Sequence, residues 1–97
     1  MKILHVLNTS KFSGAENVVC QIIGLFENDN NIEMAYCSPD GSIREALQER
    51  GIVFYPVLAL NAKELKKVIK DFNPDIVHAH DMKASFISSS LISPIFI

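Results

Sequence analysis

Short apolar runs alternate with amphipathic segments along the whole chain. The apolar runs fall at residues 3–7, 33–37, 52–55 and 75–78, and residues 95–97 indicate the start of a fifth. Between them, residues 15–27, 62–72 and 82–92 carry apolar side chains every three to four positions, which is typical of helices. The expected apolar stripe of the first helix is Ala15, Val18, Val19, Ile22, Ile23 and Phe26. Asn61 is the predicted cap of the second helix, which Asn73-Pro74 ends. After a predicted turn at residues 38–41, Ser42 and Glu45 form a predicted capping box for a further short helix, which Gly51 ends. Strict alternation of strand and helix predicts an α/β fold, a parallel sheet with helices on both faces.

The composition restricts the class of the protein. Ninety-seven residues are enough for one small domain, and 48% of them are apolar. A net charge of −2 provides no positive field that would attract nucleic acid. Cys20 and Cys37 belong to no Cys-x-x-Cys or Cys/His cluster, so we expect two reduced core thiols in a cytoplasmic protein. Residues 3–7 are too short for a signal peptide, and residues 84–97 are too short and too polar for a transmembrane helix.

A turn of small residues joins the first predicted strand to the first predicted helix. It contains Ser13, Gly14, Ala15 and Glu16. The start of a helix presents free backbone N–H groups, which favour an anion such as phosphate. A capping box of Ser13 and Glu16 would explain these two residues without a ligand. It does not require Gly14, which lets a ligand approach closely, so both interpretations stay open.

The fourth apolar run ends in His78, Ala79, His80 and Asp81. In a doubly wound sheet the first and fourth strands are neighbours, and ligands bind beyond their carboxyl ends. We therefore expect Asn8, His80 and Asp81 to line one crevice. The alternative is that Asp81 only caps the next helix and that the two histidines bond backbone carbonyls.

No metal site is expected from the sequence. His78 and His80 stand two residues apart at the end of a strand and lack further obvious ligands. His5, in the middle of the first strand, is expected to be a core side chain whose hydrogen bonds are satisfied.

One predicted helix has a basic face. Residues 62–72 carry four lysines opposite the apolar stripe: Lys63, Lys66, Lys67 and Lys70. Such a face can contact an anionic membrane surface, whereas the simpler interpretation is the solvated outer face of an α/β domain.

Three segments resemble the N-terminal domain of glycosyltransferase family 4, which consists of retaining enzymes of the GT-B fold. They are residues 1–7, residues 13–16 and residues 74–80, in this order and spacing. The resemblance implies two Rossmann-like domains with the active site between them. The N-terminal domain would bind mainly the acceptor, a glycan or a lipid-linked molecule, and the C-terminal domain would bind the nucleotide-sugar donor with a pair of glutamates. It implies no metal or other cofactor.

The same resemblance implies roles for particular residues. The family's Gly-Gly turn lies near the donor diphosphate, and here Gly14 matches the second glycine while Ser13 replaces the first. Ser13, Gly14, Ala15 and Glu16 would then lie on the donor-phosphate side of the cleft. Asn8, His80 and Asp81 would lie on its acceptor side. No catalytic residue is assigned.

The length departs from the family pattern. Residues 1–97 would form an incomplete N-terminal domain, with the donor-binding domain absent, so we expect a fragment that is inactive alone. The parent enzyme is expected in the cytoplasm, where it can bind peripherally to the inner face of the membrane. The alternative is a non-catalytic binding module that partners a separate donor-binding chain. A flavodoxin-like signalling domain is a weak third interpretation, because Leu7-Asn8-Thr9 lacks an acidic pair for a metal.

Overall fold

A parallel sheet of five strands, in the order β3-β2-β1-β4-β5, forms the centre of the fold. The computed structural model describes residues 1–91 and 95–97. Its strands are β1 (Lys2–Val6), β2 (Glu33–Pro39), β3 (Val53–Val57), β4 (Ile76–Ala79) and β5 (Ile95–Phe96). Its helices are α1 (Gly14–Leu25), α2 (Ile43–Glu49), α3 (Ala62–Phe72) and α4 (Met82–Ser89). The predicted Rossmann-like α/β fold, with β1 beside β4, is thereby confirmed.

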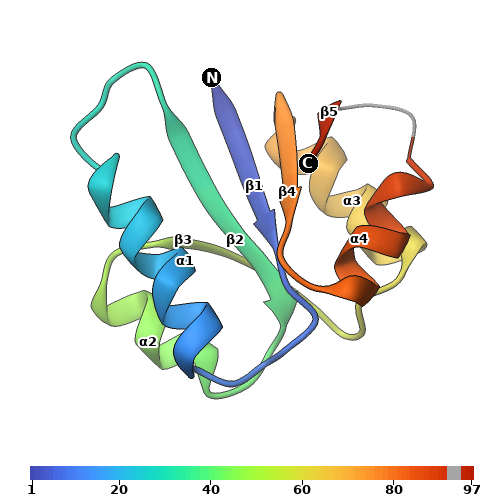
Figure 1. Ribbon diagram of the computed structural model, residues 1–97, viewed down its shortest axis with the longest axis horizontal. Coiled ribbons are helices and arrows are strands. Elements are labelled where there is room, and N and C mark those ends of the chain that lie inside the picture. Colours follow the sequence, from blue (N-terminus) through green and yellow to red (C-terminus); the bar gives the residue numbers. More distant parts are fainter. Residues whose placement is uncertain (92–94) are drawn as a thin grey trace.

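Helices cover the sheet on both sides (Figure 1). Leu4 and Val6 of β1 are fully buried in one core cluster, together with side chains of α3 and α4. Leu7, directly after β1, belongs to the opposite cluster, together with Tyr36 of β2 and side chains of α1 and α2. Successive residues of a strand point to opposite faces. The chain at β1 therefore contributes to both cores.

The buried face of α1 agrees with the predicted one only in part. Of the expected stripe, Val19 and Ile23 are buried and Ile22 and Phe26 are half-buried, but Val18 is 54% exposed and Ala15 is exposed. The residues that are buried are Glu16, Val19, Cys20 and Ile23. They follow the i, i+3, i+4, i+7 spacing of a single helix face. The helix is rotated because the Glu16 side chain is turned inward, where it accepts hydrogen bonds from the preceding loop.

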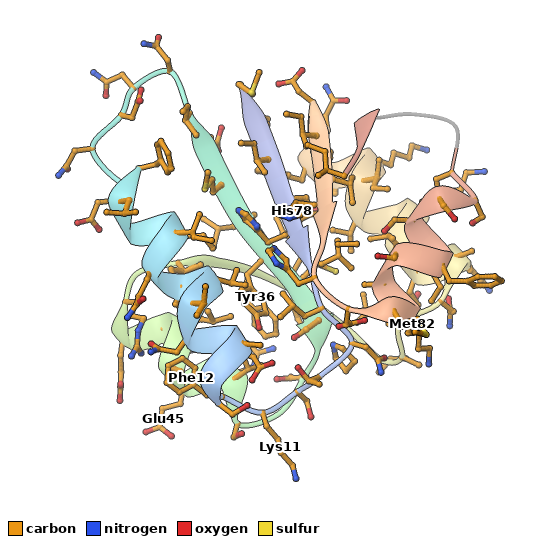
Figure 2. All side chains as sticks on the ribbon, viewed as in Figure 1. Lys11, Phe12, Tyr36, Glu45, His78 and Met82 are labelled. Atoms are coloured by element: carbon orange, nitrogen blue, oxygen red, sulfur yellow. The ribbon has the colours of Figure 1, made fainter. Side chains whose placement is uncertain are left out.

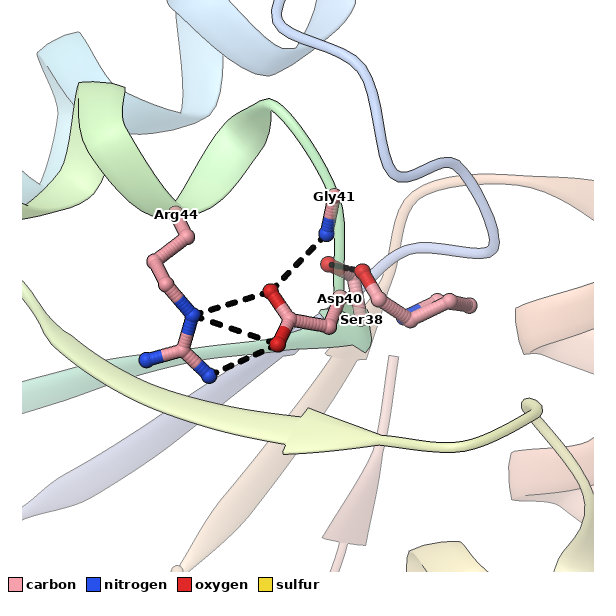
Figure 3. A network of polar contacts seen from close by, with 5 residues as sticks. Ser38, Asp40, Gly41 and Arg44 are labelled. Carbon is pink, nitrogen blue, oxygen red and sulfur yellow. Dashed lines mark hydrogen bonds and ion pairs between the residues drawn. The ribbon is translucent and has the colours of Figure 1, made fainter.

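The start of α2 also differs from the prediction. Ser42 makes no side-chain capping bond, so the expected capping box with Glu45 does not form. Asp40 organises this turn instead, as Figure 3 shows. Its Oδ1 accepts a hydrogen bond from the Gly41 N–H at 2.9 Å, and its carboxylate accepts three from the guanidinium of Arg44, two at 2.9 Å and one at 3.2 Å. Both ionic side chains are exposed to solvent, so the pair contributes little to the stability of the fold.

The other helix ends follow the predicted signals more closely. Asn61 caps α3, accepting a hydrogen bond from the Glu64 N–H at 2.8 Å. Asn73 ends α3 before Pro74 in a left-handed conformation with φ of 55°. The last helix ends at Ser89, and Ile92 lies outside the described residues. None of the helices within residues 1–91 and 95–97 has the length and apolar character that crossing a membrane requires.

The loop after β1 packs directly on the turn before α2. The backbone N–H of Ile43 donates to the carbonyl oxygen of Ser10 at 2.9 Å. A Cβ added at Gly41 would lie 2.7 Å from the Cβ of Ser10 and 2.8 Å from its carbonyl oxygen. Glycine is therefore required at position 41, because any side chain would push this loop away.

We predict opposite effects for two glycine-to-alanine substitutions. Gly41→Ala should lower the free energy of unfolding by about 1–3 kcal/mol, because the added methyl group forces Ser10 to move. Gly24→Ala is the control. It adds a Cβ with no described atom within 4 Å on an exposed helical position, and should raise stability by about 0.5–1 kcal/mol. Urea unfolding followed by circular dichroism measures both changes, and equal effects would contradict the close contact at Ser10.

Candidate functional site

The loops that follow β1 and β4 meet at the carboxyl edge of the sheet. The backbone N–H of Asn8 donates to Oδ2 of Asp81 at 2.6 Å, and the His80 N–H donates to the carbonyl of Val6 at 3.0 Å. The other carboxylate oxygen of Asp81 accepts from the Ala84 N–H at 2.8 Å, so Asp81 is the N-cap of α4. The structure thus brings Asn8, His80 and Asp81 together. Asp81 serves both as the cap and as the bridge between the two loops.

The segment before α1 is held by the carboxylate of Glu16. Its Oε1 accepts hydrogen bonds from the backbone N–H of Ser13 at 2.9 Å and from the Ser13 hydroxyl at 2.5 Å. Its Oε2 accepts from the hydroxyl of Thr9 at 2.8 Å. These hydrogen bonds, above all the one from the Ser13 hydroxyl, lower the pKa of Glu16. Since Thr9 follows Asn8, a continuous series of polar contacts connects Asp81 with the first turn of α1.

The four residues of this segment have different surroundings. Glu16 is 4% exposed and its carboxylate is used within the loop, whereas Ser13, Gly14 and Ala15 are exposed. No described atom lies within 4 Å of the position that a Cβ on Gly14 would take. The first turn of α1, whose N–H groups have no partner within the helix, therefore faces open space above Gly14.

All three histidines of the chain come together on one face of the sheet. His5 lies beside His78 in the pairing of β1 with β4, and its Nδ1 is 2.9 Å from Nε2 of His80. Its other ring nitrogen, Nε2, is 3.4 Å from the sulfur of Met34. His5 is 1% exposed, while His78 and His80 are half-buried. Hydrogen bonds from His78 and His80 to backbone carbonyls were the alternative prediction. His80 instead contacts the imidazole of His5.

The cluster disfavours positive charge on its imidazoles. Burial, with the neighbouring rings of His80 and His78, lowers the pKa of His5 to about 3. Burial and the ring of His78 lower the pKa of His80 to about 4, against the opposing effect of the Asp81 carboxylate. His5 was expected as a core side chain, and its grouping with His78 and His80 was not expected from the sequence. The available signal was that His5 and His78 take similar positions in two strands expected to be neighbours.

A buried tyrosine lies next to the histidines. Tyr36 of β2 pairs with His5 of β1 on the side opposite His78, and Figure 2 shows Tyr36 and His78 near the centre of the molecule. Tyr36 is fully buried, and its hydroxyl has no hydrogen-bond partner among residues 1–91 and 95–97. Burial raises the pKa of this phenol. Both cysteines are also buried, as expected, and burial raises the pKa of Cys37 to about 12.

The basic face predicted for α3 lies on the surface. All four of its lysines are exposed, and Lys67 is 3.4 Å from the carboxylate of Glu64. The opposite face, with Leu65, Val68 and Phe72, is buried in the core. The described structure therefore leaves this lysine face accessible.

Comparisons with solved structures show the same fold in larger proteins. A glycosyltransferase from Rickettsia africae ESF-5 matches 98% of this chain with a TM-score of 0.72 and 20% sequence identity. The UDP-GlcNAc 2-epimerase from Neisseria meningitidis, solved with UDP-GlcNAc bound, matches 93% with a TM-score of 0.66 and 22% identity. The match covers 28% of each of these chains. Among curated protein sequences, none matches this chain.

A sequence profile supplies the family. The profile described as Glycosyl transferase 4-like matches residues 3–95, which run from β1 into β5. The match therefore includes the complete series of alternating strands and helices and both loops that meet at the edge of the sheet. This chain belongs to the glycosyl transferase 4-like family.

Proposed function

We propose that this chain is the acceptor-side part of a retaining glycosyltransferase, which moves a sugar from a nucleotide-sugar donor to a glycan or lipid-linked acceptor. The observation that carries the proposal is the family match over residues 3–95. The structural similarity to an epimerase solved with UDP-GlcNAc adds support for nucleotide-sugar binding in the parent protein.

The two loops at the carboxyl edge of the sheet take different parts in this proposal. The donor-phosphate side comprises Ser13, Gly14, Ala15 and Glu16, with backbone N–H groups of the first turn of α1 as the phosphate-binding groups. Glu16 acts there as a positioning residue, because its carboxylate is 4% exposed and bonded to Ser13 and Thr9. The helix N-terminus stabilises negative charge without a metal ion.

The acceptor side of the proposed cleft comprises Asn8, His80 and Asp81. The carboxylate of Asp81 already accepts two backbone hydrogen bonds, from Asn8 and Ala84. Its part is therefore to hold the two loops together. Asn8 and His80, which are both half-buried, are then the two side chains of this side that can meet an acceptor hydroxyl.

A second domain completes the proposed enzyme. The chain spans 28% of each of the two solved proteins that it resembles. Transfer requires donor and acceptor to be held together, and in this proposal the donor-binding residues other than the first turn of α1 come from a separate Rossmann-like domain. The chain tested alone with nucleotide sugars should then give no transfer. Transfer by these 97 residues alone, or epimerisation of the donor by the complete protein, would contradict the proposal.

We predict that Gly14→Val in the complete enzyme lowers the rate of sugar transfer by about 10- to 100-fold. The valine side chain would stand between the first-turn N–H groups of α1 and the donor diphosphate. The melting temperature should change little, because the added Cβ meets no described atom within 4 Å. A lower melting temperature with an unchanged rate per folded molecule would show that the segment is only a structural cap.

Glu16 should show the opposite behaviour in the same assays. Glu16→Ala removes three hydrogen bonds and should cost about 2 kcal/mol of stability, whereas Glu16→Gln keeps part of them and should cost about 1 kcal/mol. Because the folded-state pKa of Glu16 is lowered, the stability from its charge is present above its ordinary pKa and is lost as pH falls through the folded-state value. The difference in the free energy of unfolding between wild type and Glu16→Gln should therefore shrink below about pH 4.5. Urea unfolding at several pH values measures it, and a difference that is constant with pH would contradict this role.

We further propose that the lysine face of α3 brings the cytoplasmic enzyme to an anionic membrane surface. Each lysine near such a surface contributes about 1 kcal/mol, although Glu64 already pairs with Lys67. Replacing Lys63, Lys66, Lys67 and Lys70 by glutamine should reduce co-sedimentation with phosphatidylserine vesicles and leave binding to neutral vesicles unchanged. The double variant Lys66→Gln/Lys70→Gln should lose more of its binding to phosphatidylserine vesicles than the control Lys11→Gln/Lys83→Gln, which removes the same charge elsewhere. If both double variants lost vesicle binding equally, the effect would be one of net charge alone, and binding through the lysine face of α3 would be contradicted.

A further inference from the structure

The three histidines form a set of metal-binding donors that the sheet itself assembles. One ring nitrogen from each of His5, His78 and His80 lies within 4.8 Å of the others. We propose that these three imidazoles bind one divalent transition-metal ion, of which zinc is the representative. The expectation of no metal site rested on the lack of a third ligand beside His78 and His80, and the pairing of β1 with β4 supplies His5.

Sheet geometry explains why the three rings converge. His5 and His78 are direct partners in neighbouring parallel strands, which lie about 4.8 Å apart. His78 and His80 stand two residues apart, so their side chains leave the chain on the same side. The ring centroids are correspondingly close, at 5.5 Å for His5 with His78, 5.1 Å for His5 with His80 and 4.1 Å for His78 with His80.

The distances between the nitrogens suit a zinc ion after small adjustments. Zinc–imidazole bonds of about 2.0–2.1 Å in a tetrahedron place two ligand nitrogens about 3.3 Å apart. The pair His5 Nδ1 and His80 Nε2, at 2.9 Å, would have to open slightly. Other pairs, at up to 4.8 Å, would have to close. His78 and His80 are half-buried and can rotate to do so, while the buried His5 provides a fixed donor.

Hydrogen bonding already prepares the correct nitrogen of His5. Its Nε2 faces the sulfur of Met34 at 3.4 Å, a weak acceptor that suits a proton on Nε2. The lone pair of Nδ1 then points to His80 and accepts the proton of its Nε2. Binding of a metal replaces this hydrogen bond, and the proton of His80 moves from Nε2 to Nδ1 of the same ring. Each imidazole then donates one lone pair to the ion in its neutral form.

An ion bound here would be accessible to solvent, and a nearby carboxylate would balance part of its positive charge. On β4, Val77 is buried against α3 and α4, whereas Ile76 and His78, which point to the opposite side, are only partly buried. An ion held by three ligands on this side has a fourth position for water or a ligand anion. The carboxylate of Asp81, next to His80 in the chain, provides a nearby negative charge.

Titration of the chelator-treated chain with Zn²⁺ tests the proposal directly. We expect one ion per chain, with a dissociation constant at or below about 1 μM in competition with a zinc indicator dye. The melting temperature should rise with the zinc concentration. Because the chain has three histidines, ¹⁵N-histidine NMR should show all three imidazoles changing together at one equivalent. Co²⁺ should give visible d–d bands without a thiolate charge-transfer band.

Variants separate this site from other donors. His78→Ala and His80→Ala change half-buried side chains and should weaken zinc binding at least about 100-fold while the circular dichroism spectrum stays that of a folded chain. The control Cys20→Ala/Cys37→Ala should bind as wild type does. Millimolar affinity, a stoichiometry other than one, or NMR changes confined to fewer than three imidazoles would overturn the proposal, and so would unaltered binding in His78→Ala/His80→Ala. These measurements involve no sugar transfer, so their result is independent of the proposed enzymatic function.

Discussion

The pairing of β1 with both β2 and β4 is the constraint on which the rest of the structure depends. Leu4 and Val6 are fully buried on one face, and His5 and Leu7 are 1% exposed on the other. A strand buried on both faces cannot shift by one residue without exchanging its two cores. Its position therefore sets the register of both neighbours, and with it the meeting of the loops after β1 and β4.

Two buried or half-buried carboxylates shape the edge of the sheet where those loops meet. Asp81 holds the Asn8 backbone and caps α4, while Glu16 holds Ser13 and Thr9. Both accept hydrogen bonds from groups of the protein itself. What remains for a ligand are backbone N–H groups at the start of α1 and the imidazoles on the neighbouring face of the sheet. The two carboxylates thus act by placing other groups, which fits a domain that contributes one wall of a cleft.

The sequence was a good guide wherever the signal was local. Asn61 and Asp81 were recognised as helix caps because a capping residue acts within three positions of itself. The predictions failed where a residue outside the predicted motif decided the outcome. The face of α1 was wrong at Ala15 and Val18 because Glu16 turns inward and bonds to Thr9, and the cap of α2 was wrong because Asp40 engages Gly41 and Arg44. Gly41 was read as an ordinary turn residue, although Ser10 is what excludes a side chain there.

The sequence by itself determined the alternation of strands and helices, hence the parallel sheet, its order and the family resemblance that the profile match supports. Only the tertiary structure decided which polar side chains share one environment. His5 and His78 are 73 positions apart and meet because of strand register, which depends on the packing of whole strands. Tyr36 of β2 pairs with His5 on its other side, so Tyr36, His5 and His78 form a row across three neighbouring strands. Local patterns carry no information about such rows, so the histidine cluster could be found only once the strands were placed side by side.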